Sequence, residues 1–141
     1  MVVRLWVYKW GTPGSNIVEV VEDKVVYAGD VIYGGWMLAI LPVSRVDEWI
    51  KVIDKLRSFD NVVFVPGHGE PGNLQKFEDS NYHYVTTLKA HMDKAIEDGI
   101  ELQSAIDSLD QSEWQNLADF EALASRNAHQ TYLEREMAAF E

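Results

Sequence analysis

Short apolar stretches separated by turn residues fill the first third of the chain. Residues 2–9, 16–21 and 24–28 are rich in valine, tyrosine and tryptophan, which favour extended strands. Only the acidic pair Glu22 and Asp23 separates the second stretch from the third, as in a tight hairpin. The pattern therefore predicts three strands, of which the second and third pair in antiparallel orientation.

The next segment changes to helical spacing and then back to a strand. Apolar residues recur every three or four positions from Val46 to Leu56, which predicts a helix over residues 45–58. Ser44 precedes this helix and is expected to cap its first turn. The continuous apolar run at residues 61–65 is typical of a strand that is buried on both faces. The order strand, helix, strand indicates a βαβ crossover with parallel strands.

The second half of the chain is predicted to be helical. The pattern indicates one long helix from Phe77 that ends at Gly99, a short helix over residues 102–109 and a terminal helix over residues 120–137. No linker or repeat divides the chain, so residues 1–141 are expected to form a single α/β domain. We expect a mixed sheet of about four or five strands, with about three or four helices on one face.

Composition excludes several classes of partner and site. The formal net charge is −11, from 23 acidic and 12 basic residues, so nucleic acid and anionic membranes would repel the chain. It has no cysteine, which excludes disulfides and thiolate metal sites. The apolar run from Val31 to Val43 is shorter than the roughly 20 residues that span a bilayer, and we interpret it as a loop or buried edge. Because residues 1–6 look like a strand and not like a secretory signal, we expect a cytoplasmic protein.

Two short motifs place candidate metal ligands where strands end. Asp30 follows Gly29 at the end of the third strand, and His68 lies in the Pro66-Gly67-His68-Gly69 loop after the next one. Ligands bind at this edge of mostly parallel sheets. A carboxylate can bridge two divalent ions, and an imidazole suits zinc, iron or manganese. Asp30 and His68 are therefore candidate shared ligands. The alternative is that both side chains only hold their turns by hydrogen bonds.

The order of these motifs resembles the carboxy-terminal half of the metallo-β-lactamase superfamily. The resemblance runs through the turn Thr12-Pro13-Gly14, the Gly-Asp and Pro-Gly-His-Gly motifs, the helix over residues 82–99 and the terminal helix at residues 126–134. In these hydrolases the aspartate bridges two metal ions and the loop histidine is the last ligand. The resemblance thus implies Asp30 as the bridging ligand, His68 as a ligand to one ion, and zinc or iron as the metal.

The chain also departs from the family pattern. The family's first metal cluster, a His-x-His-x-Asp-His run, is absent, and Gly11 stands where a further histidine precedes the Thr-Pro-Gly turn. We therefore expect the isolated chain to bind metal weakly or not at all, and to act by assembly or binding without catalysis. The alternative is a metal-dependent hydrolase of an ester, thioester or lactone, completed by dimerisation or by a partner chain that carries the missing ligands. A truncated reading frame is a third interpretation.

The family fold is an αββα sandwich of two similarly built halves, and the resemblance implies that this chain supplies one half. Its helices would cover one face of the sheet and leave the other face open. An open apolar face favours association, so we predict a homodimer packed sheet to sheet.

Other aromatic and imidazole side chains have simpler interpretations. His83, His91 and His129 lie on predicted helices, where an imidazole is usually a packed or solvent-facing polar tip. The tryptophans fit core positions better than a carbohydrate site. They are Trp6, Trp10, Trp36, Trp49 and Trp114.

Overall fold

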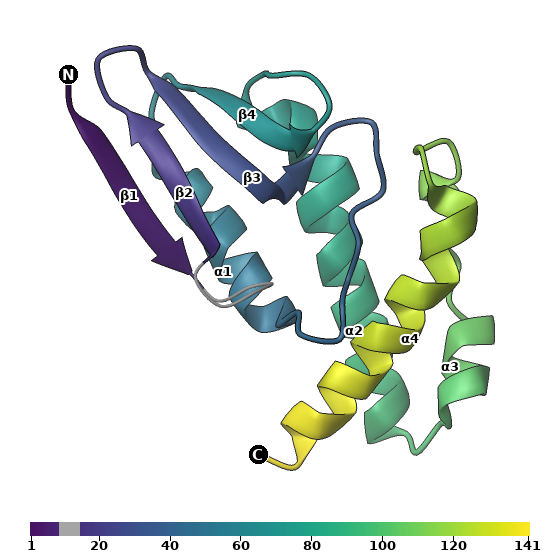
Figure 1. Cartoon of the computed structure of the whole chain (residues 1–141). Helices are drawn as coiled ribbons and strands as arrows, with labels where there is room; N and C mark the ends of the chain where they lie inside the picture. Colours follow the sequence, from purple (N-terminus) through teal and green to yellow (C-terminus); the bar gives the residue numbers. More distant parts are fainter. Residues whose placement is uncertain (9–14) are drawn as a thin grey trace.

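The computed structural model describes residues 1–8 and 15–141. The predicted turn at residues 12–14, and the interpretations of Trp10 and Gly11, lie outside the described residues. Four strands form one sheet beside a group of helices (Figure 1). In chain order the elements are β1 (Val3–Tyr8), β2 (Ser15–Val20), β3 (Val25–Tyr33), α1 (Val46–Leu56), β4 (Val63–His68), η1 (Leu74–Phe77), η2 (Glu78–His83), α2 (Tyr84–Glu97), α3 (Leu102–Asp107), η3 (Ser112–Trp114) and α4 (Phe120–Ala139).

The sheet is mixed, as predicted. Its strand order is β1-β2-β3-β4. The pairs β1–β2 and β2–β3 are antiparallel, and β3 pairs with β4 in parallel. The parallel pair is joined through α1, which confirms the βαβ crossover. The predicted hairpin between β2 and β3 is also present, and Lys24 has a positive φ of 53° in its turn.

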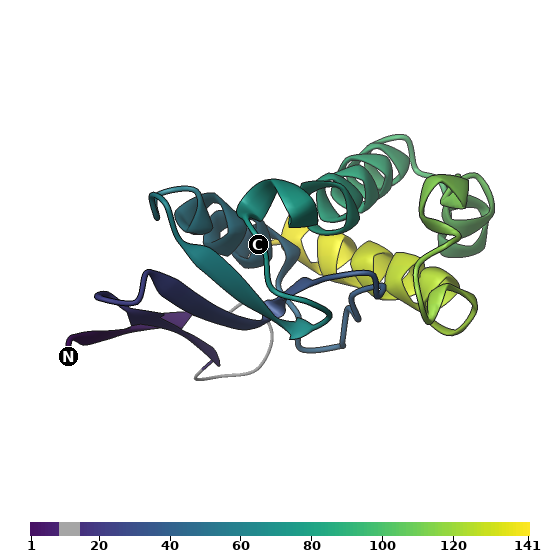
Figure 2. The ribbon, with the colours of Figure 1, turned by 90° about the horizontal axis from the view of Figure 1, so that it is seen from above.

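The helices lie on one side of the sheet, and in the view from above no helix of the described residues covers its opposite face (Figure 2). The core fills the space between sheet and helices, because the strands supply Ile17, Val26 and Phe64, and α1 supplies Trp49 and Leu56, all buried. The predicted helices on one face of a mixed sheet are therefore confirmed. No helix within the described part of the chain is long and apolar enough to cross a bilayer.

Two details of the sequence prediction were wrong. Ser44 does not cap α1, because its hydroxyl accepts a hydrogen bond from the backbone N–H of Leu41 (2.9 Å) and so closes the preceding turn. Trp36 is not a core residue, since 41% of it is exposed, whereas Trp49 and Trp114 are buried. Both errors fall in the irregular segment between β3 and α1, where local spacing carries little information about side-chain direction.

The long helix predicted from Phe77 begins irregularly. The 3-10 turn η1 leads into the π-helical turn η2 before α2 takes up regular α-helical geometry. The predicted end at Gly99 is confirmed. Gly99 has a positive φ of 70°, and the N–H of Ile100 donates to the carbonyl of Ala95 (2.8 Å).

The face of the sheet that no helix covers is apolar along two cross-strand rows. Because side chains alternate along a strand, residues at matching register positions point to one face. The register aligns Val3, Val20, Val25 and Val63 in one row, and Leu5, Val18, Tyr27 and Val65 in the next. We call these residues the open face.

Candidate functional site

A bulge at the end of β3 exposes Asp30. Residues 29–33 of β3 lie opposite residues 66–68 of β4, so β3 has extra residues at this point. Gly29 adopts a φ of 58°, which a glycine reaches without steric cost. The side chain of Asp30 is 62% exposed as a result, although the following residues Val31 and Ile32 are fully buried.

The loop that carries His68 folds back on its own strand. Phe64 and Gly72 exchange two backbone hydrogen bonds (2.8 and 3.1 Å), which close the Pro-Gly-His-Gly motif into a compact loop. Pro66 is tolerated within β4 because β4 is an edge strand. Gly67 is required by space, since a Cβ atom there would collide with the carboxylate of Asp30 and lie 2.8 Å from the carbonyl carbon of Gly29.

These two local structures bring the predicted ligands together. The Nε2 atom of His68 lies 3.6 Å from Oδ1 of Asp30, at the exposed rim of the sheet. The imidazole stacks on the ring of Tyr33, with centroids 4.9 Å apart and planes 12° apart. Trp36 contacts the same imidazole at a tilt, with centroids 5.9 Å apart. The ring of His68 is therefore oriented by aromatic contacts as well as by Asp30.

The end of β3 is fixed to the rest of the fold by a buried asparagine on η2. The side-chain oxygen of Asn81 accepts from the N–H of Tyr33 (2.8 Å), and its amide nitrogen donates to the carbonyls of Tyr33 (2.7 Å) and Phe77 (2.8 Å). Asn81 is fully buried. The side chain of Asn81 thus bonds to the backbone of Tyr33 as a neighbouring strand would. It fixes the position of Tyr33, whose ring stacks on His68.

Tyr33 is a neutral phenol at physiological pH. Burial raises the pKa of its hydroxyl to about 12, the negative charge of Asp30 adds to the rise, and a hydrogen bond with the backbone of Ala39 opposes it. A neutral ring is a suitable stacking partner for an imidazole in either protonation state. Tyr33 therefore supports His68 by packing and not as a charged group.

The donors at this rim do not fit a tight metal centre. Among the described residues, the single group of three or more potential ligand side chains lies elsewhere, at Asp79, His83 and Glu113. The pair at the rim thus has no third histidine or carboxylate in reach within that part of the chain. One carboxylate and one imidazole leave about half of the four-coordinate shell of zinc to water. The expected weak or absent metal binding stays a prediction.

Solved structures with the metallo-β-lactamase fold superimpose on the chain. A metallo-beta-lactamase family protein from Thermus thermophilus matches 98% of it with a TM-score of 0.61 and 18% identity. A stereoselective inverting sec-alkylsulfatase from Pseudomonas sp. matches 92% with a TM-score of 0.65 and 15% identity. No family profile and no curated protein sequence matches the chain. The chain therefore has part of the metallo-β-lactamase fold, as the motifs predicted.

The match covers only part of each neighbour. The chain spans 44% of the length of the Thermus protein and 23% of the length of the alkylsulfatase. At this level of identity the likeness concerns the fold alone.

Sequence reasoning found Asp30 and His68 but missed the residues that support them. Tyr33 and Trp36 lie in the apolar run that was interpreted as a loop or buried edge, and nothing in its spacing shows which side chain faces His68. Asn81 bonds to a strand that lies 48 positions earlier in the chain. A polar residue within an apolar helical pattern was the available signal, but it does not identify the partner.

Proposed function

We propose that this chain, which has part of the metallo-β-lactamase fold, acts as an assembly protein that pairs through its open face and does not catalyse hydrolysis on its own. The observation that supports this proposal is the apolar character of both cross-strand rows of that face. The exposed fraction is 61% for Leu5, 50% for Tyr27 and 46% for Val63, on three different strands. These exposed side chains lie in adjoining rows and form one continuous apolar surface.

The energetics favour a covered face. Contiguous apolar patches of more than a few hundred Å² on a protein surface mark interaction sites. Removal of such area from water gains roughly 25 cal/mol per Å², and this gain opposes the entropic cost of pairing. The charge of −11 does not prevent pairing here, because the rows carry no ionisable side chain except the phenol of Tyr27.

The occupant that we propose is a second copy of the chain. A twofold axis through the open face would place each row against a row of the partner, which gives a self-complementary contact. The chain spans less than half of the Thermus protein that it resembles in fold. Since the sandwich expected from the family resemblance has two similarly built halves, a second copy is a stereochemically suitable replacement for the other half.

The proposal is tested by measuring the mass of the protein in solution, for the wild type and for variants with a charged side chain on the open face. Leu5→Asp and Tyr27→Asp each place a carboxylate in the proposed contact, and we expect dimerisation to weaken by about thirtyfold or more. Phe140→Asp is the matched control, because Phe140 is exposed but lies at the end of α4. Multi-angle light scattering should show dimers for the wild type and the control. A wild-type monomer at micromolar concentration would contradict the proposal.

The second candidate is a metal-dependent hydrolase for an ester, thioester or lactone, completed by dimerisation or by a partner chain. It is favoured by the convergence of Asp30 and His68 at one rim, 3.6 Å apart. The purified protein would then contain zinc or iron that is lost in both Asp30→Ala and His68→Ala. A metal content that both substitutions leave unchanged, or no metal at all, excludes this candidate for the chain alone.

A further inference from the structure

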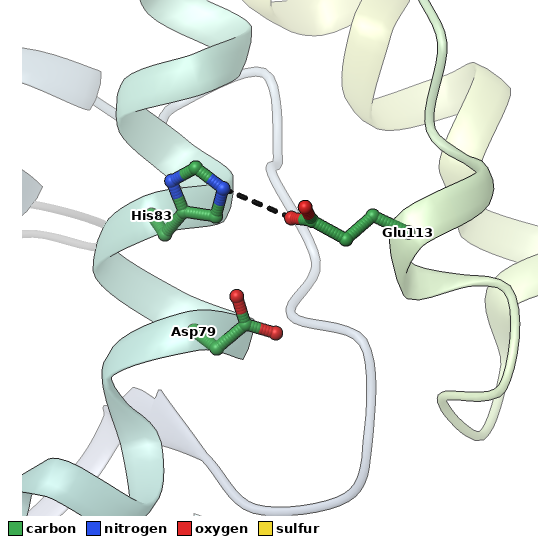
Figure 3. Close-up of side chains that lie close together, drawn as sticks. All are labelled: Asp79, His83 and Glu113. Carbon is green, nitrogen blue, oxygen red and sulfur yellow. Dashed lines mark ion pairs between the residues drawn. The ribbon is translucent and has the colours of Figure 1, made fainter.

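A second group of potential ligands lies on the helical side of the molecule, away from Asp30 and His68. Asp79 and His83 are four residues apart on η2, and Glu113 comes from η3 (Figure 3). One ligand atom from each residue lies within 4.8 Å of the others. The Nε2 atom of His83 is 2.9 Å from Oε2 of Glu113. All three side chains are exposed.

A buried tryptophan fixes the two segments that carry these side chains. The indole N–H of Trp114, next to Glu113, donates to the backbone carbonyl of Asp79 (3.0 Å). Its ring contacts the imidazole of His83 at 5.3 Å and the ring of Tyr84 edge-on at 4.9 Å. Trp114 is 4% exposed, so this contact is part of the core. The backbone at all three positions is therefore held by packing and not by the exposed ion pair.

The local backbone is also unusual. A π-helical turn is rare, and such turns often occur at functional sites. The π-helical turn η2 directs side chains both into the core and out to the surface. Asn81 points inward and bonds to Tyr33, whereas Asp79 and His83 point outward toward Glu113 (Figure 3).

The chemistry of the three groups matches a divalent transition-metal ion. Imidazole and carboxylate groups are both zinc ligands, and three protein ligands leave a further position open to water. Two carboxylates this close repel each other, and the histidine compensates for them only when it is protonated. A divalent cation would neutralise both carboxylates.

We propose that Asp79, His83 and Glu113 form a surface site for one zinc ion, which joins η2 to η3. The site is separate from the open face and does not depend on dimerisation. An ion bound there would connect the start of the α2 helix to the segment before α4. The three ligands are brought together only in the folded chain, so zinc would bind the folded state in preference to the unfolded state. Zinc would therefore raise the free energy of unfolding.

The test is titration of the metal-free full chain with zinc chloride by isothermal calorimetry, with the melting temperature measured in parallel. We expect one zinc ion per chain and a higher melting temperature. His83→Gln and Glu113→Gln should each weaken binding by about tenfold or more. Since both side chains are exposed, circular dichroism of these variants should match that of the wild type.

A matched control separates this site from other surface carboxylates. Glu121→Gln removes an exposed acidic side chain in the first turn of α4 and should bind zinc as the wild type does. The proposal is overturned if the wild type binds no zinc, or if His83→Gln and Glu113→Gln bind it unchanged. Because the mass in solution is measured separately, failure of this site and failure of the proposed dimer are distinguishable.

Discussion

Single residues set the geometry of the sheet rim, and Gly67 is the most constrained of them. The strand ends that carry Asp30 and His68 approach so closely that position 67 has no room for a side chain. A side chain at position 67 would meet both a side chain and the backbone of β3. The carboxylate of Asp30 can rotate away, but the backbone of Gly29 at 2.8 Å cannot move without a shift of β3.

Gly67→Ala is therefore expected to lower the free energy of unfolding by about 1–3 kcal/mol, the usual cost of excess volume in a packed site. Urea denaturation measures this change. The double variant Asp30→Ala/Gly67→Ala should recover only part of the loss, because the backbone contact remains. A Gly67→Ala protein as stable as the wild type would show that the strands are less closely spaced than described.

Asn127 has a comparable role on the other side of the core. It is fully buried, accepts from the N–H of Ile40 (2.8 Å) and donates to the carbonyl of Leu38 (2.7 Å). Asn127→Leu leaves both backbone groups without partners, and we expect a loss of about 2–4 kcal/mol in the free energy of unfolding. Gln103→Leu, on the exposed face of α3, is the control and should change stability by less than about 0.5 kcal/mol. An equal effect of both substitutions would contradict this role.

At the scale of elements, α4 is held to α2 and α1 by charged groups. Arg135 donates from Nε to Asp93 (2.6 Å) and from Nη1 to Asp47 (2.7 Å). These contacts join α4 to both helices.

The adjacent Glu134 is partly buried in a less favourable environment. Its carboxylate oxygens are buried without a hydrogen bond, 3.5 Å from Nε of Arg45 and 3.6 Å from Nη1 of Arg135. Burial raises the pKa of Glu134 above its usual 4.5, although Arg135 lowers it in part.

The raised pKa of Glu134 makes the free energy of unfolding depend on pH, and the direction of this dependence follows from the shift. Above its folded-state pKa, Glu134 is ionised in both states, and the folded state carries the cost of the buried charge. Below the unfolded-state pKa the group is neutral in both states and the cost is absent. Glu134→Gln should therefore raise the free energy of unfolding at pH 7, and the gain should disappear as the pH falls below 4.5. Urea denaturation across this range measures it; a destabilised Gln variant at pH 7 would contradict the sign.

Elements with local sequence signals were predictable, and contacts between distant residues were not. The spacing of Val46 to Leu56 and the apolar run at residues 61–65 were sufficient for the βαβ unit, because burial alternates with a period set by the backbone. The π turn η2 has no such signal. Asn81 and Asn127 bond to segments 48 and 87 positions away, so only the folded chain identifies their partners. Ser44 was misassigned because its hydroxyl serves a turn that local spacing does not distinguish from a cap.

The candidate site was predictable to the same extent. Asp30 and His68 stand out in the sequence because each follows a predicted strand in a glycine-containing motif, although the structure extends β3 and β4 to include them. The group at Asp79, His83 and Glu113 does not stand out, because η3 meets η2 through contacts between distant residues, such as the hydrogen bond from Trp114 to Asp79. The interpretation of His83 as a polar helical tip was a reasonable expectation from η2 alone.

At the scale of the whole molecule, the sheet is covered on one side only. The helices bury Ile17, Val26 and Phe64 on the inner face, whereas the rows of valine, leucine and tyrosine on the open face have no covering element among the described residues. The chain thus has a part of the metallo-β-lactamase fold in which one sheet face is uncovered among the described residues. We propose that a second copy of the chain covers this face.

Cross-linking tests this claim most directly, because the chain contains no cysteine. Tyr27→Cys introduces a single thiol into the open face, and Phe140→Cys introduces one at the end of α4. A short bismaleimide should link Tyr27→Cys chains into a species of twice 16.1 kDa at micromolar concentration and leave Phe140→Cys chains largely unlinked. Equal cross-linking of the two variants, or none in Tyr27→Cys, would contradict a homodimer that pairs through the open face.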